Sequence, residues 1–253
     1  FSNSATKLRA ADGVTQGTFP VGNQPEGVAY DGANVWVTNR NDNTVTKLRG
    51  SDGANLGTFA VGALPQPIAF DGAHIWVANV GDSTLTTLRA SDGAYLGTTT
   101  VGPNPYGLAF DGANLWVALF GSNEVARIRL SDHTTVKFKV GTHPMGITFD
   151  GANIWVPNMG DNTVTKIRID GVTLGTYGVG STPVFAFFDG VNVWVSNNAD
   201  NTVTKLLGST GANLGTFAVG AGPVGLAFDG TNIWVANSGS GSVTVLETRC
   251  AQK

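Results

Sequence analysis

The chain has 253 residues, of which 42% are hydrophobic and only 13% are charged. A formal net charge of −3 argues against a general polyanion-binding protein, and a single cysteine, Cys250, excludes an internal disulfide framework and a cysteine-based zinc site. The sequence lacks any run of roughly 18 apolar residues, so it predicts no membrane-spanning segment. Glutamate is scarce and glycine abundant, which disfavours a helical bundle.

A repeat of about 40 residues organises the whole chain. Each copy contains an Asp-Gly pair whose aspartate lies five residues before a tryptophan, and the six tryptophans are Trp36, Trp76, Trp116, Trp155, Trp194 and Trp234. Turn residues at fixed offsets divide each copy into four short, β-rich segments. A unit of this length with four strands is typical of one blade of a β-propeller. We therefore expect an all-β protein, a six-bladed β-propeller of four-stranded antiparallel blades.

The expected elements are taken from the first full copy. Its four strands and two tight turns are predicted at Gly27–Tyr30, Asp31–Asn34 (turn), Val35–Thr38, Thr44–Arg49, Ser51–Gly53 (turn) and Leu56–Val61. The first two strands are apolar runs, which predicts burial on both faces. The third strand places Lys47 and Arg49 on one face, which suggests a position near the outer rim.

The two ends of the chain predict how the propeller closes. We expect a single domain, 1–253, with repeats near 22–61, 62–101, 102–140, 141–179, 180–219 and 220–248. The last repeat lacks a fourth strand, whereas Ala5–Val21 already contains third- and fourth-strand sequence, so residues 14–21 are expected to complete the last blade and remove exposed edges. One third-strand segment is then left over, and we favour six blades over seven.

Two copies carry a family resemblance. The segments Asp71-Gly72-Ala73-His74-Ile75-Trp76-Val77-Ala78-Asn79 and Asp229–Asn237 resemble bacterial propeller repeats of the YVTN type and the related NHL and streptogramin-lyase (virginiamycin B lyase-like) repeats. The resemblance covers nearly the whole chain and implies the propeller fold. It does not select a function, because such propellers include binding scaffolds, envelope proteins and a few lyases or lactonases.

Departures from the repeat pattern indicate a candidate ligand site. In a propeller the loops that join the fourth strand to the next first strand share a face, here called the top face, with the loops that join the second strand to the third. Repeats three to five depart from the pattern there at Tyr106, Leu119, Phe120, Met145, Met159 and Phe185. We predict a surface for a small apolar or aromatic ligand, or for another protein, with Asn39, Asn79 or Asn158 as polar neighbours. Alternatively these side chains fill internal space, with Phe185 and Phe187 as plugs of the axial channel.

Chemistry beyond binding has weaker support in the sequence. The second-loop aspartates, Asp42, Asp82, Asp161 and Asp200, suggest calcium, but short side chains of this kind more often stabilise turns, and we predict no metal and no cofactor. Two histidines, His74 and His133, fall in turns and are expected to face solvent. The third, His143, lies on the top face and could work with Glu26 as an acid–base pair, as the lyase resemblance would require.

Partners and location follow from composition. Basic residues occur in pairs such as Arg127/Arg129 and Lys166/Arg168 on predicted rim strands, where they protect edges, so nucleic-acid binding is not predicted. Low charge with abundant Thr, Asn and Gly, and a first residue Phe1, suit a processed monomer that is secreted or held in the cell envelope. We expect a non-enzymatic binding or scaffold propeller. The alternatives are a lyase or lactone hydrolase at the axial mouth, and a structural array protein joined through the spare N-terminal segment or Cys250.

Overall fold

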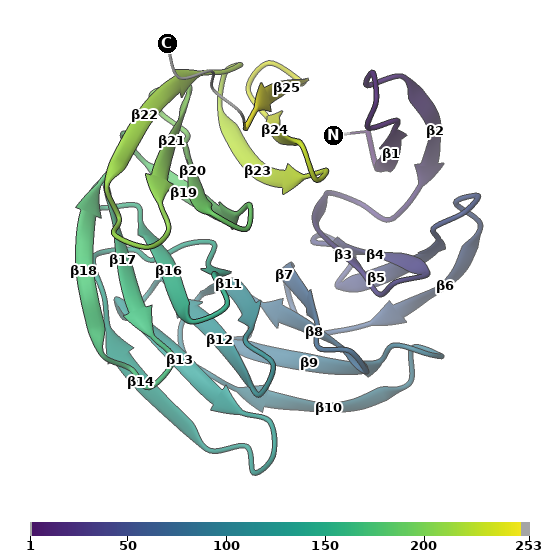
Figure 1. The fold of residues 1–253 in the computed structure, drawn as a ribbon. Coiled ribbons are helices and arrows are strands. Elements are labelled where there is room, and N and C mark those ends of the chain that lie inside the picture. Colours follow the sequence, from purple (N-terminus) through teal and green to yellow (C-terminus); the bar gives the residue numbers. More distant parts are fainter. Residues whose placement is uncertain (1, 249–253) are drawn as a thin grey trace. The chain divides into compact units, whose positions relative to one another are not determined.

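The computed structural model describes residues 2–248, which form β-strands joined by turns and loops (Figure 1). Cys250, for which we considered pairing with another chain, lies outside the described residues. Between residues 2 and 248 there is no helix that could serve as a membrane span. The chain divides into two compact units, Phe1–Gly112 and Ala113–Lys253.

The first unit opens with a two-stranded antiparallel sheet, β1–β2, and continues with two four-stranded sheets, β3–β4–β5–β6 and β7–β8–β9–β10. Neighbouring strands in each sheet are consecutive in sequence and antiparallel, as short hairpin turns require. Its strands are β1 (Ser4–Leu8), β2 (Thr15–Pro20), β3 (Pro25–Tyr30), β4 (Asn34–Asn39), β5 (Thr44–Arg49), β6 (Asn55–Ala60), β7 (Pro65–Phe70), β8 (His74–Asn79), β9 (Thr84–Arg89), β10 (Tyr95–Thr100) and β11 (Pro105–Phe110).

The second unit repeats the same plan. Its four sheets have the strand orders β11–β12–β13–β14, β15–β16–β17–β18, β19–β20–β21–β22 and β23–β24–β25. The first strand of the first of these sheets, β11, precedes the boundary of the unit in the sequence. Its strands are β12 (Asn114–Leu119), β13 (Glu124–Arg129), β14 (Thr135–Lys139), β15 (Thr148–Phe149), β16 (Asn153–Asn158), β17 (Thr163–Arg168), β18 (Thr173–Gly178), β19 (Pro183–Phe188), β20 (Asn192–Asn197), β21 (Thr202–Leu207), β22 (Asn213–Ala218), β23 (Pro223–Phe228), β24 (Asn232–Asn237) and β25 (Ser242–Glu247).

The strands predicted for the first repeat are confirmed to within two residues at each end. The chain ends also carry the predicted strand types: β1 and β2 are of the third and fourth type, and β23–β25 are the first three of a repeat. In the described structure β2 pairs with β1 in a sheet of their own and β23–β25 form a three-stranded sheet, so the sharing of a last blade stays a prediction. The prediction that first strands are buried on both faces is wrong for β3, because alternate side chains point to opposite faces and Val28 and Tyr30 are 67% and 60% exposed.

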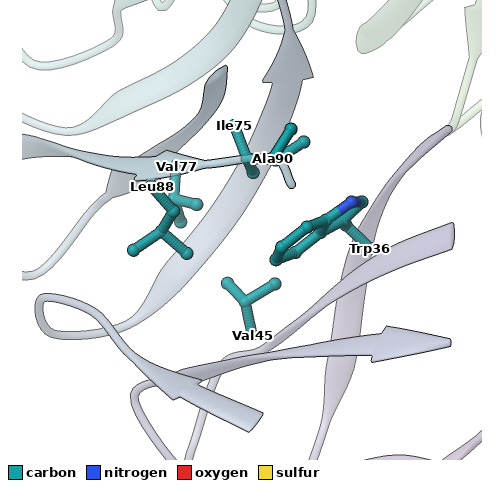
Figure 2. Close-up of a cluster of buried hydrophobic side chains, with 6 residues drawn as sticks. All are labelled: Trp36, Val45, Ile75, Val77, Leu88 and Ala90. Atoms are coloured by element: carbon teal, nitrogen blue, oxygen red, sulfur yellow. The ribbon is translucent and has the colours of Figure 1, made fainter. Parts of the chain in front are cut away.

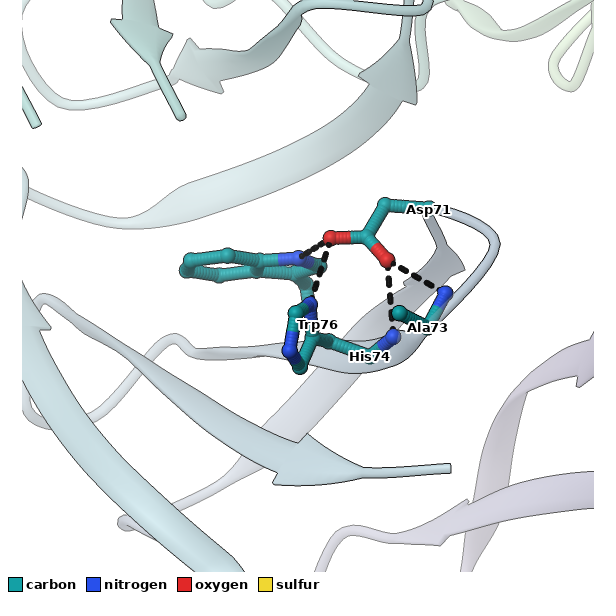
Figure 3. A network of polar contacts seen from close by, with 4 residues as sticks. All are labelled: Asp71, Ala73, His74 and Trp76. Atoms are coloured by element: carbon teal, nitrogen blue, oxygen red, sulfur yellow. Dashed lines mark hydrogen bonds and ion pairs between the residues drawn. The ribbon is translucent and has the colours of Figure 1, made fainter. Parts of the chain in front are cut away.

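The Asp-Gly turns have a second role that the sequence did not reveal (Figure 3). One carboxylate oxygen of Asp71 accepts hydrogen bonds from the backbone N–H groups of Ala73 and His74, at 2.9 and 2.7 Å. The other oxygen accepts the indole N–H of Trp76 at 2.8 Å and contacts Nδ1 of His74 at 3.1 Å. The same carboxylate-to-indole bond recurs at Asp31/Trp36, Asp150/Trp155, Asp189/Trp194 and Asp229/Trp234. Each turn thereby fixes the orientation of the tryptophan in its sheet.

These hydrogen bonds hold the aspartates in the ionised form. Burial raises the pKa of Asp71, but the bonds from Trp76 and from the backbone of Ala73 and His74 together outweigh it, and the pKa lies below its ordinary value. At Asp229 the indole of Trp234, followed by the backbone N–H of Asn232, lowers the pKa to about 2. A depressed carboxyl pKa contributes stability above the unfolded value, and that contribution is lost as the pH falls through the folded value.

The tryptophans also build the hydrophobic core between successive sheets (Figure 2). Trp36 and Val45 of one sheet pack with Ile75, Val77 and Leu88 of the next, and all five are buried. Each such tryptophan ring also lies 5.5–5.7 Å from an aromatic ring of the fourth strand of its own sheet, in the pairs Trp36–Phe59, Trp116–Phe138, Trp155–Tyr177 and Trp194–Phe217. The fourth strand is therefore held by ring packing as well as by its backbone ladder.

The lysines of the third strands are buried, which corrects the prediction that they lie on an exposed rim. Lys47 is 5% and Lys166 is 4% exposed. The Lys47 ammonium donates to the backbone carbonyls of Ala90 and Ser91 in the following sheet at 2.8 and 2.9 Å, and lies 4.8 Å from the Trp36 ring centroid. Arg49 stays exposed and pairs with Asp52. The long apolar stem of lysine explains the difference, because it reaches across the tryptophan to acceptors on the next sheet.

One loop residue of the second unit has a strained backbone. Thr182 has a φ of +56°, in the left-handed region that β-branched residues avoid, whereas the equivalent position of the next repeat is Gly222, with a φ of +63°. Both backbone N–H groups donate to an asparagine Oδ1 of the preceding repeat at 2.9 Å. We expect Thr182→Gly to raise the free energy of unfolding by roughly 0.5–1 kcal/mol, measured by urea denaturation. Ser181→Gly, next to it, should instead lower it; a loss of stability in Thr182→Gly would contradict the assignment of strain.

Candidate functional site

Hydrogen bonds between the two loop types show that they share one face of each repeat. The carboxylate of Asp161, in the loop between β16 and β17, accepts the backbone N–H of Thr142 from the loop before β15 at 2.6 Å. Equivalent bonds join Asp42 to Asn23, Asp82 to Ala63, and Asp200 to Ser181. These aspartates therefore stabilise loops, and residues 2–248 contain no group of three or more side chains that could hold a metal ion.

The top-face asparagines are structural, which corrects their predicted role as polar neighbours of a ligand. Asn39, Asn79 and Asn158 have no exposed surface. The side-chain amide of Asn39 donates to the hydroxyls of Thr44 and Thr46 at 3.0 and 2.9 Å, and the other two repeat this arrangement. In the third repeat Leu119 takes the asparagine position and is equally buried.

The feature that distinguishes the top face of the second unit is a stacked pair of rings. Phe120, in the loop after β12, and His143, in the loop before β15, have ring centroids 4.3 Å apart and planes only 9° from parallel. His143 is exposed and Phe120 half-buried. The backbone N–H of His143 donates to Oδ1 of Asn123 at 2.9 Å, which fixes its loop against the loop of Phe120. The rings thus form a preformed flat surface on two adjoining repeats.

Both methionines of the chain lie in the two loops next to His143. The backbone N–H of Met159 donates to the carbonyl of His143 at 3.0 Å, and that of Met145 donates to the carbonyl of Pro157 at 2.9 Å. Both side chains are half-buried. Phe185, from the next repeat, adjoins Gly146, since a Cβ at Gly146 would lie 2.4 Å from its ring. Backbone hydrogen bonds thus place Met145 and Met159 on the two loops next to His143, and we name Phe120, His143, Met145 and Met159 the ring-stack surface.

The remaining predicted residues have other surroundings. Phe185 and Phe187 pack against the buried cluster of the last sheet, around Trp194 and Val235. Tyr106 is a half-buried residue of β11 in the first unit. Glu26, also in the first unit, is exposed and accepts a hydrogen bond from Nε2 of Gln24 at 3.0 Å.

A carboxylate that the sequence did not connect with His143 lies near it. The backbone N–H of Thr142, with its hydroxyl, lowers the pKa of Asp161, and the charge of His143 contributes in the same direction. The sequence places His143 and Asp161 in different loops of the same repeat, so only the pairing of loop types could have indicated this neighbourhood. The predicted turn position of His133 is confirmed, and this residue is exposed, whereas His74 is the first residue of β8 and its side chain is 40% exposed beside Asp71.

Comparisons with known proteins agree with this architecture. The sequence matches no protein-family model and no curated protein. Among solved structures, hydrazine synthase from Kuenenia stuttgartiensis is similar with a TM-score of 0.85 at 20% identity, over 97% of this chain and 90% of that chain. The virginiamycin B lyase from Staphylococcus aureus is similar with a TM-score of 0.82 at 19% identity, over 98% of this chain and 89% of that one. The fold is a six-bladed β-propeller.

A third solved structure, a streptogramin B lyase, matches with a TM-score of 0.75 at 18% identity over 90% of this chain and 84% of that chain. At such identities the likeness concerns the fold of the propeller alone. The predicted all-β, six-bladed fold with four-stranded antiparallel blades is confirmed, and the ring-stack surface lies on the loops of its third and fourth blades.

Proposed function

We propose that this propeller is a non-enzymatic binding module whose ring-stack surface takes an apolar or aromatic group of a small ligand or of another protein. The observation that carries the proposal is the parallel stack of Phe120 on His143, with centroids 4.3 Å apart. The pair joins two blades and leaves the imidazole exposed. A third ring can extend such a stack at little entropic cost, because loop hydrogen bonds already hold the first two.

The methionines support the same ligand chemistry. Met145 and Met159 are the only two methionines of the chain, and both lie at the loops that carry His143. Methionine has a flexible, polarisable side chain that adapts to ligands of varied shape and makes favourable contacts with aromatic rings. An aromatic group stacked on the exposed imidazole of His143 would therefore lie at the loops that carry these two side chains.

Methyl NMR offers a direct test, because labelling methionine methyl groups gives two signals that both report on this surface. We expect N-acetyl-tryptophanamide and benzyl alcohol, used as aromatic probes, to shift both signals in a saturable way. Phe120→Ala should weaken this binding at least about tenfold, because it removes the ring that supports the stack. Val136→Ala, an exposed change on the outer strand of the same blade, should leave it unchanged.

Two outcomes would contradict the proposal. One is the absence of saturable shifts with either probe. The other is a loss of several kcal/mol in the unfolding free energy of Phe120→Ala, which would place this ring in the core rather than on a binding surface.

A lyase or lactone hydrolase is the second candidate function, and it is favoured by the position of His143, whose Nδ1 would lie 3.3 Å from a Cβ at Gly160, the residue before Asp161. In that case the chain should consume virginiamycin B or a related cyclic ester, and His143→Ala should abolish turnover while leaving the two methionine signals dispersed. A binding module would show no turnover in either protein.

A further inference from the structure

A groove of about 670 Å³ lies between the first two four-stranded sheets of the first unit, well apart in sequence from the ring-stack surface. One wall comes from β6, with Thr58 and Phe59, and the other from β9 and β10, with Thr84 and Thr98. The loop before β9 contributes Asp82. Its volume lies within the range of about 300–1,000 Å³ that is usual for ligand pockets.

The lining has a distinctive chemistry. Its polar groups are the hydroxyls of threonines and of Tyr95, together with the single carboxylate of Asp82, and no lysine, arginine or histidine is among the described residues that line it. Apolar surface comes from Phe59 and Leu88. Hydroxyls both donate and accept hydrogen bonds, and a carboxylate accepts only. Such a lining suits a neutral ligand rich in hydroxyl groups and does not suit a phosphate or another anion.

Tyr95 gives the groove an aromatic platform. It is 62% exposed, and its hydroxyl lies 2.9 Å from the Thr98 hydroxyl, a contact that fixes the ring over the groove wall. A bulge between Tyr95 and Gly97 places Tyr95 on the same side of β10 as Thr98. The face of an aromatic ring carries negative charge density, which attracts the weakly positive C–H groups on the face of a sugar ring.

Comparison among the repeats shows that this aromatic residue is special to the second one. The positions equivalent to Tyr95 are Thr15, Asn55, Thr135, Thr173 and Asn213, all small and polar. Conversely, the inward aromatic position of the fourth strand, occupied by Phe59 in the first repeat, is Thr99 in the second. The second repeat has therefore lost the ring that packs inside and carries one that faces outward, which stability alone does not explain.

A second groove in the protein provides a natural comparison. It has the same position relative to β14, β17 and β18, but its volume is only about 330 Å³. Thr173 replaces Tyr95 there, Asp161 corresponds to Asp82, and the ammonium-bearing Lys139 is added to the lining. The backbone plan is thus shared, whereas the first groove has the tyrosine platform and no lysine in its described lining.

We propose that the groove between β6 and β9–β10 binds a neutral saccharide, with Tyr95 stacking on the sugar ring and Asp82 and the threonine hydroxyls bonding its hydroxyl groups. The backbone N–H of Ala63 donates to Asp82, so the carboxylate is held in place before a ligand arrives. This site belongs to residues 58–98 of the first unit and is independent of the ring-stack surface.

Saturation-transfer NMR and calorimetric titration with neutral sugars test this proposal. The probes are glucose, galactose, mannose, N-acetylglucosamine and disaccharides of each. At least one probe should bind saturably at millimolar concentration or below. Tyr95→Thr, which introduces the residue type that the second groove has at this position, should weaken that binding at least about tenfold. Asp82→Asn should weaken it several-fold while keeping an acceptor for Ala63, and Thr173→Ala should leave it unchanged.

Folding defects are separable from loss of the site. Because Tyr95 is mostly exposed, Tyr95→Thr should keep the wild-type thermal midpoint. The proposal is overturned if no sugar of the panel binds, or if Tyr95→Thr binds the sugar as well as the unaltered protein does. A Thr173→Ala variant that loses binding as strongly as Tyr95→Thr would also overturn it, since the sugar would then occupy the second groove.

Discussion

Replacing Trp155 by alanine should lower the free energy of unfolding by about 3–5 kcal/mol, the range found for truncating large aromatic core residues. Trp155 has no exposed surface, and its ring lies 5.6 Å from that of Tyr177 and 4.8 Å from the Lys166 ammonium. Its indole N–H donates to Asp150 at 2.7 Å. Alanine removes all three contacts and leaves a cavity between two sheets. Urea unfolding followed by circular dichroism measures the loss.

Two matched variants separate burial from the hydrogen bond. Trp155→Phe keeps a ring in the core but leaves one Asp150 oxygen without its indole donor, so we expect a loss of about 1–3 kcal/mol. Leu174→Ala, on β18 of the same sheet and 46% exposed, should change stability by no more than about 0.5 kcal/mol. A Trp155→Ala variant no less stable than Leu174→Ala would contradict the view that the repeated tryptophan holds the sheets together.

The strands and turns could be predicted because their causes are local and repeated. Glycine after aspartate, as at Gly72 with its φ of +102°, allows a tight turn, and six copies of that turn fix the register of everything between them. The third strand of the first repeat, Thr44–Arg49, agrees with its prediction residue for residue. Because each copy of the turn belongs to one blade, six copies also predict six blades.

Burial of polar side chains could not be predicted in the same way, because it depends on what the neighbouring sheet offers. Lys47 and Arg49 have the same charge and lie on one face of β5, yet only Lys47 meets the carbonyls of Ala90 and Ser91. Asn39 similarly finds two threonine hydroxyls within its own sheet. These donors and acceptors meet only when separate turns and strands come together in the fold. The spacing of residues along the chain therefore does not predict these hydrogen bonds.

The candidate site falls between these two cases. Departures from the repeat pattern indicated Phe120 and the methionines, because a residue that differs from its counterparts in the other repeats can have a role that they do not share. They also drew attention to Leu119, which is buried, since a change of residue type does not say which way the side chain points. The stack of Phe120 on His143 was missed because histidine and phenylalanine belong to different repeats and to different loop types.

Lys166→Met should lower the free energy of unfolding by about 2 kcal/mol. Methionine keeps an apolar stem against Trp155 but removes the donor that bonds the carbonyls of Gly208 and Ser209 at 2.6 and 3.2 Å. A buried carbonyl left without a donor costs about 1–3 kcal/mol, and loss of the cation over the ring adds about 0.5–2 kcal/mol. Part of this loss is offset, because the methionine variant no longer has to desolvate an ammonium group when it folds. The change in urea midpoint measures the net effect.

An exposed lysine gives the matched control. Lys137→Met removes the same charge from the surface of the preceding sheet and should change stability by no more than about 0.5 kcal/mol. Lys47→Met, in the first unit, removes an equivalent pair of carbonyl bonds and should resemble Lys166→Met in size. If both buried variants instead matched Lys137→Met, the carbonyls of the following turn would have to find other donors. The buried lysines would then make no net contribution to stability and would not link successive blades.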